Sequence, residues 1–253
     1  MGHGPRRALA IHCSLAHSGS WRPLAREVSG ALTLTTFDLP GHGQSGDWEG
    51  HGEIQAVSTA MAADFLEGST DIIGHSFGAT VALRLAVERP DLVRSLILYE
   101  PVFFAVALQD HPELRAGHLA EMAAYSQGMA AGDFYRAAEG FTRVWGDGRG
   151  WEALPEAARA AMAAQIPLIE AAAGALYDDA GGMLASGALE RVAVPVLLME
   201  GSASRPIIAA INAGLAARLP DACRVVVEGA GHMGPITHPE VVAAEVLGFL
   251  GEG

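Results

Sequence analysis

The chain has 253 residues, half of them hydrophobic, so it can bury a sizeable core in one large domain or two small ones. Its formal net charge of −13 disfavours nucleic acid and anionic membrane surfaces as partners. It contains no lysine, which excludes any mechanism that needs a lysine base or a lysine Schiff base.

Short apolar runs alternate along the chain with longer amphipathic runs. This alternation predicts a mainly parallel, doubly wound α/β sheet with helices on both faces. The runs of strand type are residues 8–12, 32–37, 70–74, 95–99, 194–199 and 224–227. The runs of helix type are residues 21–28, 54–66, 77–88, 206–219 and 239–250.

One interval breaks this alternation. Residues 103–191 contain no convincing strand, and a segment of this length is not a simple loop in a compact domain. Its alanine-rich helical patterns cover residues 113–125, 133–144, 155–170 and 171–177. We therefore expect a helical insertion at 103–191 within a core formed by residues 1–102 and 192–253.

The sequence Gly-His-Ser-Phe-Gly at positions 74–78 stands between a strand-type run and a helix-type run. In this context the motif predicts a nucleophile elbow, a sharp turn that raises one serine hydroxyl above the sheet edge. Residues two before and two after that serine must be small, so that the strand and the helix can approach each other. Glycine occupies both places, and we predict Ser76 as the nucleophile. A serine that only caps the helix is the simpler alternative.

Two further motifs accompany the elbow. Asp-Leu-Pro-Gly-His-Gly-Gln-Ser at 38–45 follows the second strand run, and Gly-Ala-Gly-His-Met at 229–233 follows the last one. Together the three motifs resemble the α/β-hydrolase family over nearly the whole chain outside the insertion. The resemblance implies an α/β-hydrolase fold with strand order 2-1-3-4-5-6 and a helical cap, formed by 103–191, over the active site. Because only seven residues precede the first strand run, we expect six strands of the family's six to eight.

A serine hydroxyl needs a base that removes its proton during attack, and an imidazole suits this role. His232 lies in a glycine-rich loop after the last strand run, at the sheet edge where ligands bind in open α/β sheets. His238 is the nearest competitor, but its surroundings are typical of a helix start. His75 adjoins the serine, yet adjacent residues on a turn point apart. We therefore predict His232 as the base.

The acid of the expected triad is displaced in this sequence. Family members usually carry an aspartate in a Gly-x-x-Asp pattern after the fifth strand counted here, whereas residues 201–204 are Gly-Ser-Ala-Ser. Glu100 follows the strand run after the elbow helix, where some members, including many haloalkane dehalogenases, carry their acid. We predict Glu100 as the acid. Glu200 is a rival at the end of a later strand, and Asp178 and Asp179 in the insertion are weaker candidates.

Ester hydrolysis also needs donors for the negative charge that develops on the substrate oxygen. The backbone N–H of Phe77, at the start of the elbow helix, is one candidate. By the resemblance, the N–H of Ser14 in the loop after the first strand supplies the other. Cys13 stands where the family usually has glycine, and a buried thiol there is more often inert than nucleophilic. His12 and His17 lack acidic or thiol companions, so we expect no metal and no cofactor.

These residues predict a cofactor-independent serine hydrolase that acts through Ser76, His232 and Glu100 on a small, largely apolar ester or related carbonyl compound. Carbon–carbon bond hydrolysis, lactonase activity and perhydrolase activity on the same triad are alternatives. An alternative of another class is a non-catalytic ligand-binding protein on a hydrolase scaffold. Several methionines and four aromatic side chains of the insertion are candidates to line the pocket: Phe103, Phe104, Trp145 and Trp151.

The expected location is the cytoplasm. Cys13 and Cys223 lie far apart, and so small a number of cysteines suits a reducing compartment. The apolar run near the N-terminus is too short for a signal sequence, and no stretch approaches the ~20 apolar residues that span a bilayer. We therefore expect a small-molecule substrate and neither a nucleic-acid nor a membrane partner.

Overall fold

The computed structural model describes residues 1–185 and 187–251, and a six-stranded sheet forms its centre. The strand order is β2-β1-β3-β4-β5-β6 and all neighbouring strands are parallel, so the predicted sheet and its order are confirmed. The strands are β1 (Arg6–Ile11), β2 (Leu32–Thr36), β3 (Thr70–His75), β4 (Val93–Tyr99), β5 (Val196–Gly201) and β6 (Ala222–Val227).

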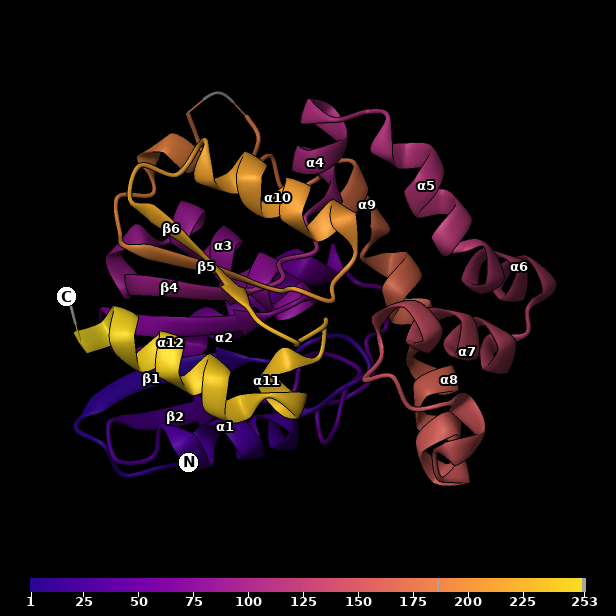
Figure 1. The fold of residues 1–253 in the computed structure, drawn as a ribbon, viewed down its shortest axis with the longest axis horizontal. Helices are drawn as coiled ribbons and strands as arrows, with labels where there is room; N and C mark the ends of the chain where they lie inside the picture. The colour runs from indigo at the N-terminus through magenta and orange to yellow at the C-terminus, as the bar shows by residue number, and fades with distance from the viewer. Residues whose placement is uncertain (186, 252–253) are drawn as a thin grey trace.

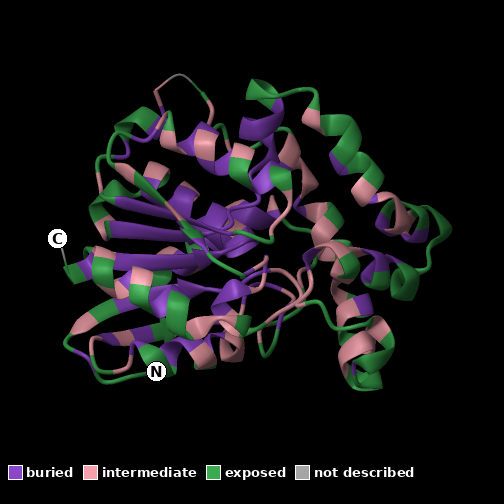
Figure 2. Cartoon of the chain, in the orientation of Figure 1, coloured by how far each residue is buried: buried purple, intermediate pink, exposed green. Residues whose placement is uncertain are grey.

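Helices cover both faces of this sheet (Figure 1). On one face, α1 (Arg22–Glu27) and α12 (Pro239–Gly251) share a buried apolar cluster with the strands. On the other face, α2 (Ile54–Asp64), α3 (Phe77–Glu88) and α10 (Pro206–Ala216) contribute to a second, larger cluster. The central strands are therefore buried on both sides, as Figure 2 shows, and this explains their nearly continuous apolar sequence.

Short helical turns lie in several of the connections. They are η1 (Ser18–Trp21), η2 (Pro90–Leu92), η3 (Trp151–Ala153), η4 (Leu189–Arg191) and α11 (Gly234–Thr237). None of the helices in the described ranges is long and apolar enough to cross a membrane.

Between β4 and β5 the described residues form helices and no strand, and α5 to α8 lie beside the sheet at the right of Figure 1. The expected helix at 113–125 is wrong in its extent, because the chain bends at Met122 and forms two helices. The sequence also missed α4, whose first five residues are all apolar and buried, so that it lacks an amphipathic period. The helices are α4 (Phe104–Asp110), α5 (Leu114–Glu121), α6 (Ala123–Ala131), α7 (Phe134–Trp145), α8 (Glu156–Ala171) and α9 (Ala173–Tyr177).

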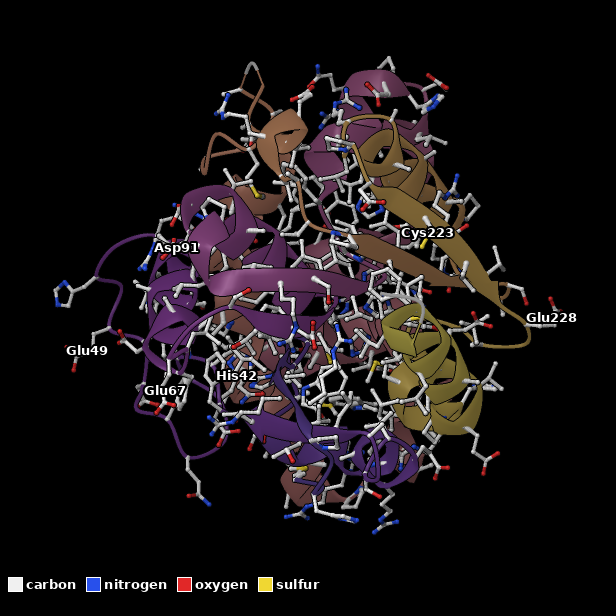
Figure 3. The ribbon with its side chains drawn as sticks, turned by 90° about the vertical axis from the view of Figure 1, so that its left-hand side faces the viewer. His42, Glu49, Glu67, Asp91, Cys223 and Glu228 are labelled. Carbon is white, nitrogen blue, oxygen red and sulfur yellow. The ribbon has the colours of Figure 1, made fainter. Side chains whose placement is uncertain are left out.

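The acidic side chains that dominate the net charge lie mainly on the surface. Figure 3 shows Glu49 and Glu228 pointing away from the molecule at opposite edges, whereas His42 lies within it. Asp71 is an exception, because its side chain is fully buried at the amino end of β3. It accepts hydrogen bonds from Arg6 of β1 (3.0 Å) and from Arg94 of β4 (2.9 Å), so one carboxylate joins three strands.

The ionisation of Asp71 should make the free energy of unfolding depend on pH. Burial alone would raise the pKa of Asp71, but hydrogen bonds from Arg94, Arg6 and Ser95 outweigh burial and hold this pKa at about 2. The ionised carboxylate therefore stabilises the fold above its unfolded pKa near 4, and this contribution disappears as pH falls toward 2. We expect Asp71→Asn to lower the free energy of unfolding by about 2 kcal/mol at pH 7.

Urea unfolding of both proteins at pH 7, pH 4 and the lowest pH that keeps them folded measures this difference. The difference in free energy of unfolding between the wild-type protein and the Asp71→Asn variant should become smaller as the pH falls. A gap that is independent of pH would show that the ionised form of Asp71 does not carry the stabilisation.

Candidate active site

Ser76 stands on a strained turn between β3 and α3. Its backbone has φ 56° and ψ −119°, a conformation that few non-glycine residues adopt. A Cβ atom on Gly74 would lie 2.5 Å from Cα of Ala79, and one on Gly78 would lie 2.3 Å from the carbonyl oxygen of Ile11. Glycine is therefore required at both places by close backbone approach, as the elbow motif predicts.

His232 lies beside this serine. Its Nε2 is 2.9 Å from Oγ of Ser76, and both residues are nearly buried, with exposed fractions of 8% and 6%. Trp145 of α7 packs edge-on against the imidazole, with ring centroids 4.8 Å apart. The helical insertion therefore contacts the histidine directly. His238, the competing candidate, instead hydrogen-bonds Thr237 at the end of α11.

Two side chains from the ends of neighbouring strands hold the loop that carries His232. Nε2 of His75 donates to the carbonyl oxygen of His232 (2.8 Å), and the hydroxyl of Tyr99 donates to that of Gly231 (2.8 Å). Burial, together with the nearby His232, lowers the pKa of His75 to about 3. His75 is therefore neutral at physiological pH and adds no charge beside the site.

Glu100 completes a hydrogen-bonded chain with these residues. Its Oε2 is 2.7 Å from Nδ1 of His232, and its side chain has no exposed surface. Its other oxygen accepts from the N–H of Gly201 (2.9 Å) and from the hydroxyl of Ser204. Glu100 has φ 47°, so the chain turns sharply where β4 ends and directs the carboxylate toward the histidine loop. Ser204, which occupies the family's usual acid position, thus contacts the carboxylate.

The rival acids lie elsewhere. Glu200 points to the other side of β5, where Asn212 of α10 donates to it (2.8 Å) and Arg224 of β6 does so at 3.1 Å. Asp179 accepts from two backbone N–H groups in the turn after α9, and Asp178 is exposed. None of these three carboxylates has a hydrogen bond to a histidine among the described residues.

The predicted backbone donors are the N–H of Phe77, directly after Ser76, and the N–H of Ser14, which lines the same cavity as Ser76. Phe77 is the first residue of α3, so its N–H is free of helical bonding and lies at the positive end of the helix dipole. The N–H of Ser14 likewise has no hydrogen-bond partner in residues 1–185 and 187–251. The next N–H, that of Leu15, donates to Nε2 of His42 (3.3 Å) and is therefore occupied.

Two buried histidines fix the loop that contains Ser14. His12 donates from Nδ1 to the carbonyl oxygen of Cys13 (2.7 Å) and accepts from the N–H of Leu39 (3.0 Å). Burial lowers the pKa of His12 to about 3 and also lowers that of His42, so both rings are neutral. Cys13 has an ordinary negative φ, and burial raises the pKa of its thiol to about 12, which suits packing rather than nucleophilic attack.

The described residues hold no group of three or more side chains suited to bind a metal ion. Both nitrogens of His12 are used in the hydrogen bonds above, and His17 accepts from the N–H of Gly19. These contacts give both histidines a structural role in their loops.

Two hollows near Ser76 share Ser14 and Trp145 in their walls. The first is a cavity that is lined mainly by apolar side chains and includes Ser76. The second is a groove that includes Met233. Of the aromatic residues expected to line a pocket, Phe104 and Trp145 line the cavity, whereas Phe103 and Trp151 do not. Phe103 is instead fully buried in the apolar core, directly before α4, which packs against α10 and α9.

Comparison with known proteins decides the family. The sequence profile described as "Alpha/beta hydrolase family" matches residues 8–245. This chain belongs to the α/β-hydrolase family. A pimeloyl-(acyl-carrier protein) methyl ester esterase of Neisseria meningitidis serogroup A is 32% identical to this α/β hydrolase over 252 residues, which cover 97% of the chain and 77% of that esterase.

Two further relatives differ in how much they match. Lipase LipV of Mycobacterium tuberculosis is 40% identical over 108 residues, which cover 42% of the chain and 40% of the lipase. The crystal structure of carboxylesterase CesB from Bacillus subtilis has a TM-score of 0.68 and 20% sequence identity, and covers 99% of this α/β hydrolase and 86% of that chain. At this identity the structural likeness shows the fold alone.

Sequence reasoning missed the residues that position others. His75 lies within the elbow motif, but the relevant signal was its place at a strand end beside Tyr99, in register with it in the sheet. Ser204 was noticed only as a missing acid. Its value as a hydrogen-bond donor to Glu100 could have been inferred from the expectation that a buried carboxylate needs donors.

The requirement for glycine in the elbow can be tested by measuring the free energy of unfolding of substituted proteins. Gly78→Ala should lower the free energy of unfolding by about 1–3 kcal/mol, because the added methyl group overlaps the backbone of β1. Gly117→Ala is the matched control, since Gly117 lies in α5 with open space around it and should gain about 0.5–1 kcal/mol. Thermal and urea unfolding of both variants measure the difference. Equal effects at the two positions would contradict the close approach of β1 and α3.

Proposed function

We propose that this α/β hydrolase is a cofactor-independent serine esterase in which Ser76 is the nucleophile, His232 the base and Glu100 the acid. The observation that carries the proposal is the continuous chain of hydrogen bonds from Ser76 through His232 to Glu100. Esterase and lipase relatives support the same reaction class. The same contacts argue against a serine that merely caps α3, whose hydroxyl would bond to the helix instead.

In the first half of the reaction, Oγ of Ser76 attacks the ester carbonyl carbon and its proton passes to Nε2 of His232. The carbonyl oxygen becomes an oxyanion and accepts hydrogen bonds from the N–H groups of Phe77 and Ser14. When the tetrahedral intermediate collapses, the bond to the alcohol oxygen breaks. That oxygen takes the proton from His232 and leaves as the alcohol, while the acyl group stays on Ser76.

In the second half, a water molecule attacks the acyl carbon and gives a proton to His232. The new tetrahedral intermediate collapses, the acid leaves, and Ser76 regains its proton. Glu100 keeps Nδ1 of His232 protonated and stabilises the imidazolium that forms in each half. Because Glu100 has no exposed surface, its charge acts on His232 with little screening by water.

We also propose that residues 103–191 act as a cap that shapes the substrate site. The cavity beside Ser76 is walled mainly by apolar side chains of this segment, which supports an ester with a largely apolar acyl group. The name of the meningococcal relative makes a methyl ester of a longer acyl chain a candidate substrate. Carbon–carbon bond hydrolysis, lactonase and perhydrolase activity use the same groups and stay alternatives without a specific observation in their favour.

The nucleophile is tested by Ser76→Ala. This change should lower the rate of hydrolysis of a short p-nitrophenyl ester by at least about 10⁴-fold and leave the fold intact, because no other group supplies the attacking oxygen. A fluorophosphonate probe should label the wild-type serine and not the variant. Retained hydrolysis in a folded Ser76→Ala protein would overturn the assignment.

The acid is tested by comparing two glutamates. Glu100→Gln should lower kcat by about 10³–10⁴-fold, because an amide cannot stabilise the imidazolium. Glu200→Gln makes the same chemical change at a neighbouring strand end and should alter kcat by less than about threefold. Circular dichroism and thermal unfolding check that both variants fold. If only Glu200→Gln loses activity, Glu100 is not the acid.

A further inference from the structure

The wall of the cavity beside Ser76 includes polar side chains that the proposed mechanism does not use, and one of them, Glu170, is also exposed to solvent. Tyr125 of α6, Glu170 of α8 and Tyr177 of α9 all line it, and all three come from the helical insertion. We call them the phenol–carboxylate cluster. Burial raises the pKa of both tyrosines and Glu170 raises both further, whereas Arg115 lowers that of Tyr177.

Tyr177 has a buried partner behind the cavity wall. Its hydroxyl lies 2.6 Å from Nε2 of His118, a residue with 4% exposed surface that packs against Phe104. Burial, and to a smaller degree Arg115, lowers the pKa of His118 to about 4, so the imidazole is neutral and carries one N–H.

The hydrogen-bond direction of this pair follows from the other ring nitrogen. Nδ1 of His118 is buried and has no hydrogen-bond partner among the described residues. An unpaired N–H is rarer in protein interiors than an unpaired acceptor, so the proton belongs on Nε2, which donates to Tyr177. The proton of the Tyr177 hydroxyl is then left to donate to a ligand in the cavity.

Glu170 offers the complementary group. The hydroxyl of Tyr125 donates to its Oε2 over 3.4 Å, a long bond that leaves most of the carboxylate's acceptor capacity free. The cluster therefore presents one donor, on Tyr177, and one charged acceptor, on Glu170. A ligand hydroxyl matches both at once, because it accepts one hydrogen bond and donates another. A ligand carboxylate accepts from Tyr177 but has no hydrogen to donate to Glu170, and the two like charges would repel each other.

The place of the leaving group decides which part of the substrate reaches this cluster. The departing alcohol must lie beside Nε2 of His232 to receive its proton. The groove is lined by Met233, the residue after His232, and shares Ser14 and Trp145 with the cavity, so it suits the alcohol. The cavity contains Ser76, which holds the acyl group through the second half of the reaction, and therefore suits the acyl chain.

We propose that Tyr125, Glu170 and Tyr177 form a subsite for a hydroxyl group on the acyl chain of the ester, and that the same subsite rejects acyl chains ending in a carboxylate. This inference rests on the proposed esterase function. It names the substrate class as esters of hydroxylated fatty acids.

The test compares methyl esters that share a leaving group and differ only at the far end of the acyl chain. Methyl hexanoate, methyl 6-hydroxyhexanoate and monomethyl adipate form one such set, and sets with chains of four to ten carbons scan the distance to the subsite. Chromatography of the released acids gives kcat/KM. At the best length the hydroxylated ester should be preferred over the alkyl ester by about tenfold, and the carboxylated ester should be the poorest.

Variants assign this preference to the cluster. Tyr177→Phe and Glu170→Gln should each reduce the preference for the hydroxyl, measured as the ratio of kcat/KM for the hydroxylated ester to that for the alkyl ester, at least about threefold. Glu170→Gln should also improve the carboxylated ester. Tyr135→Phe and Glu156→Gln are the matched controls, because Tyr135 donates to Glu156 (3.1 Å) on the exposed face of the insertion, away from the cavity. Both controls should keep the wild-type preference.

Failure of this inference can be told apart from failure of the esterase proposal. If alkyl esters are hydrolysed but no chain length shows a preference for the hydroxyl, or the controls change it as much as the cluster variants, the subsite is overturned and the esterase stands. If no ester is hydrolysed, calorimetric titration with 6-hydroxyhexanamide and hexanamide decides the subsite. About tenfold tighter binding of the hydroxylated amide supports it, and equal or absent binding overturns it.

Discussion

A carboxylate without exposed surface needs donors at fixed positions, and Glu100 has three of them. They come from Gly201 at the end of β5, from Ser204 in the loop beyond it, and from His232 in the loop after β6. One buried charge therefore sets the relative positions of three segments that lie far apart in the sequence. The orientation of the imidazole toward Ser76 depends on this arrangement, because Nδ1 is held by Glu100 while Nε2 faces the serine.

The two central strands carry a satisfied carboxylate at each end of the sheet. At the amino edge, Asp71 of β3 is bound by side chains from β1 and β4. At the carboxyl edge, Glu100 follows β4, and His75 and Tyr99 support the histidine loop from β3 and β4. The register of β3 against β4 is thus restrained at both ends by polar contacts as well as by the apolar core. The elbow depends on that register, since Ser76 follows directly after β3.

The sequence predicted the sheet correctly, and it indicated residues of the candidate site where the local backbone or a strand end requires a particular residue type. Close backbone approach requires Gly74 and Gly78, so the elbow was visible, and the end of an apolar strand made Glu100 a candidate acid. It predicted less where a role depends on a distant partner, as with His75 and Ser204. It missed α4 because a helix buried on all sides has no amphipathic period. The cytoplasmic location and the absence of nucleic-acid partners stay predictions, because composition alone supports them.

The contact between Ser204 and Glu100 bears on what fixes the position of the acid in such a site. Ser204 lies where, by the family resemblance, an acid is expected, and here its hydroxyl donates to the carboxylate of Glu100, the acid that we propose. The residue after β4 and the loop after β5 therefore lie next to each other, close to Nδ1 of His232. The residue at either strand end thus lies next to the same charge, and what the imidazole requires is a place for that charge in space rather than a fixed place in the sequence.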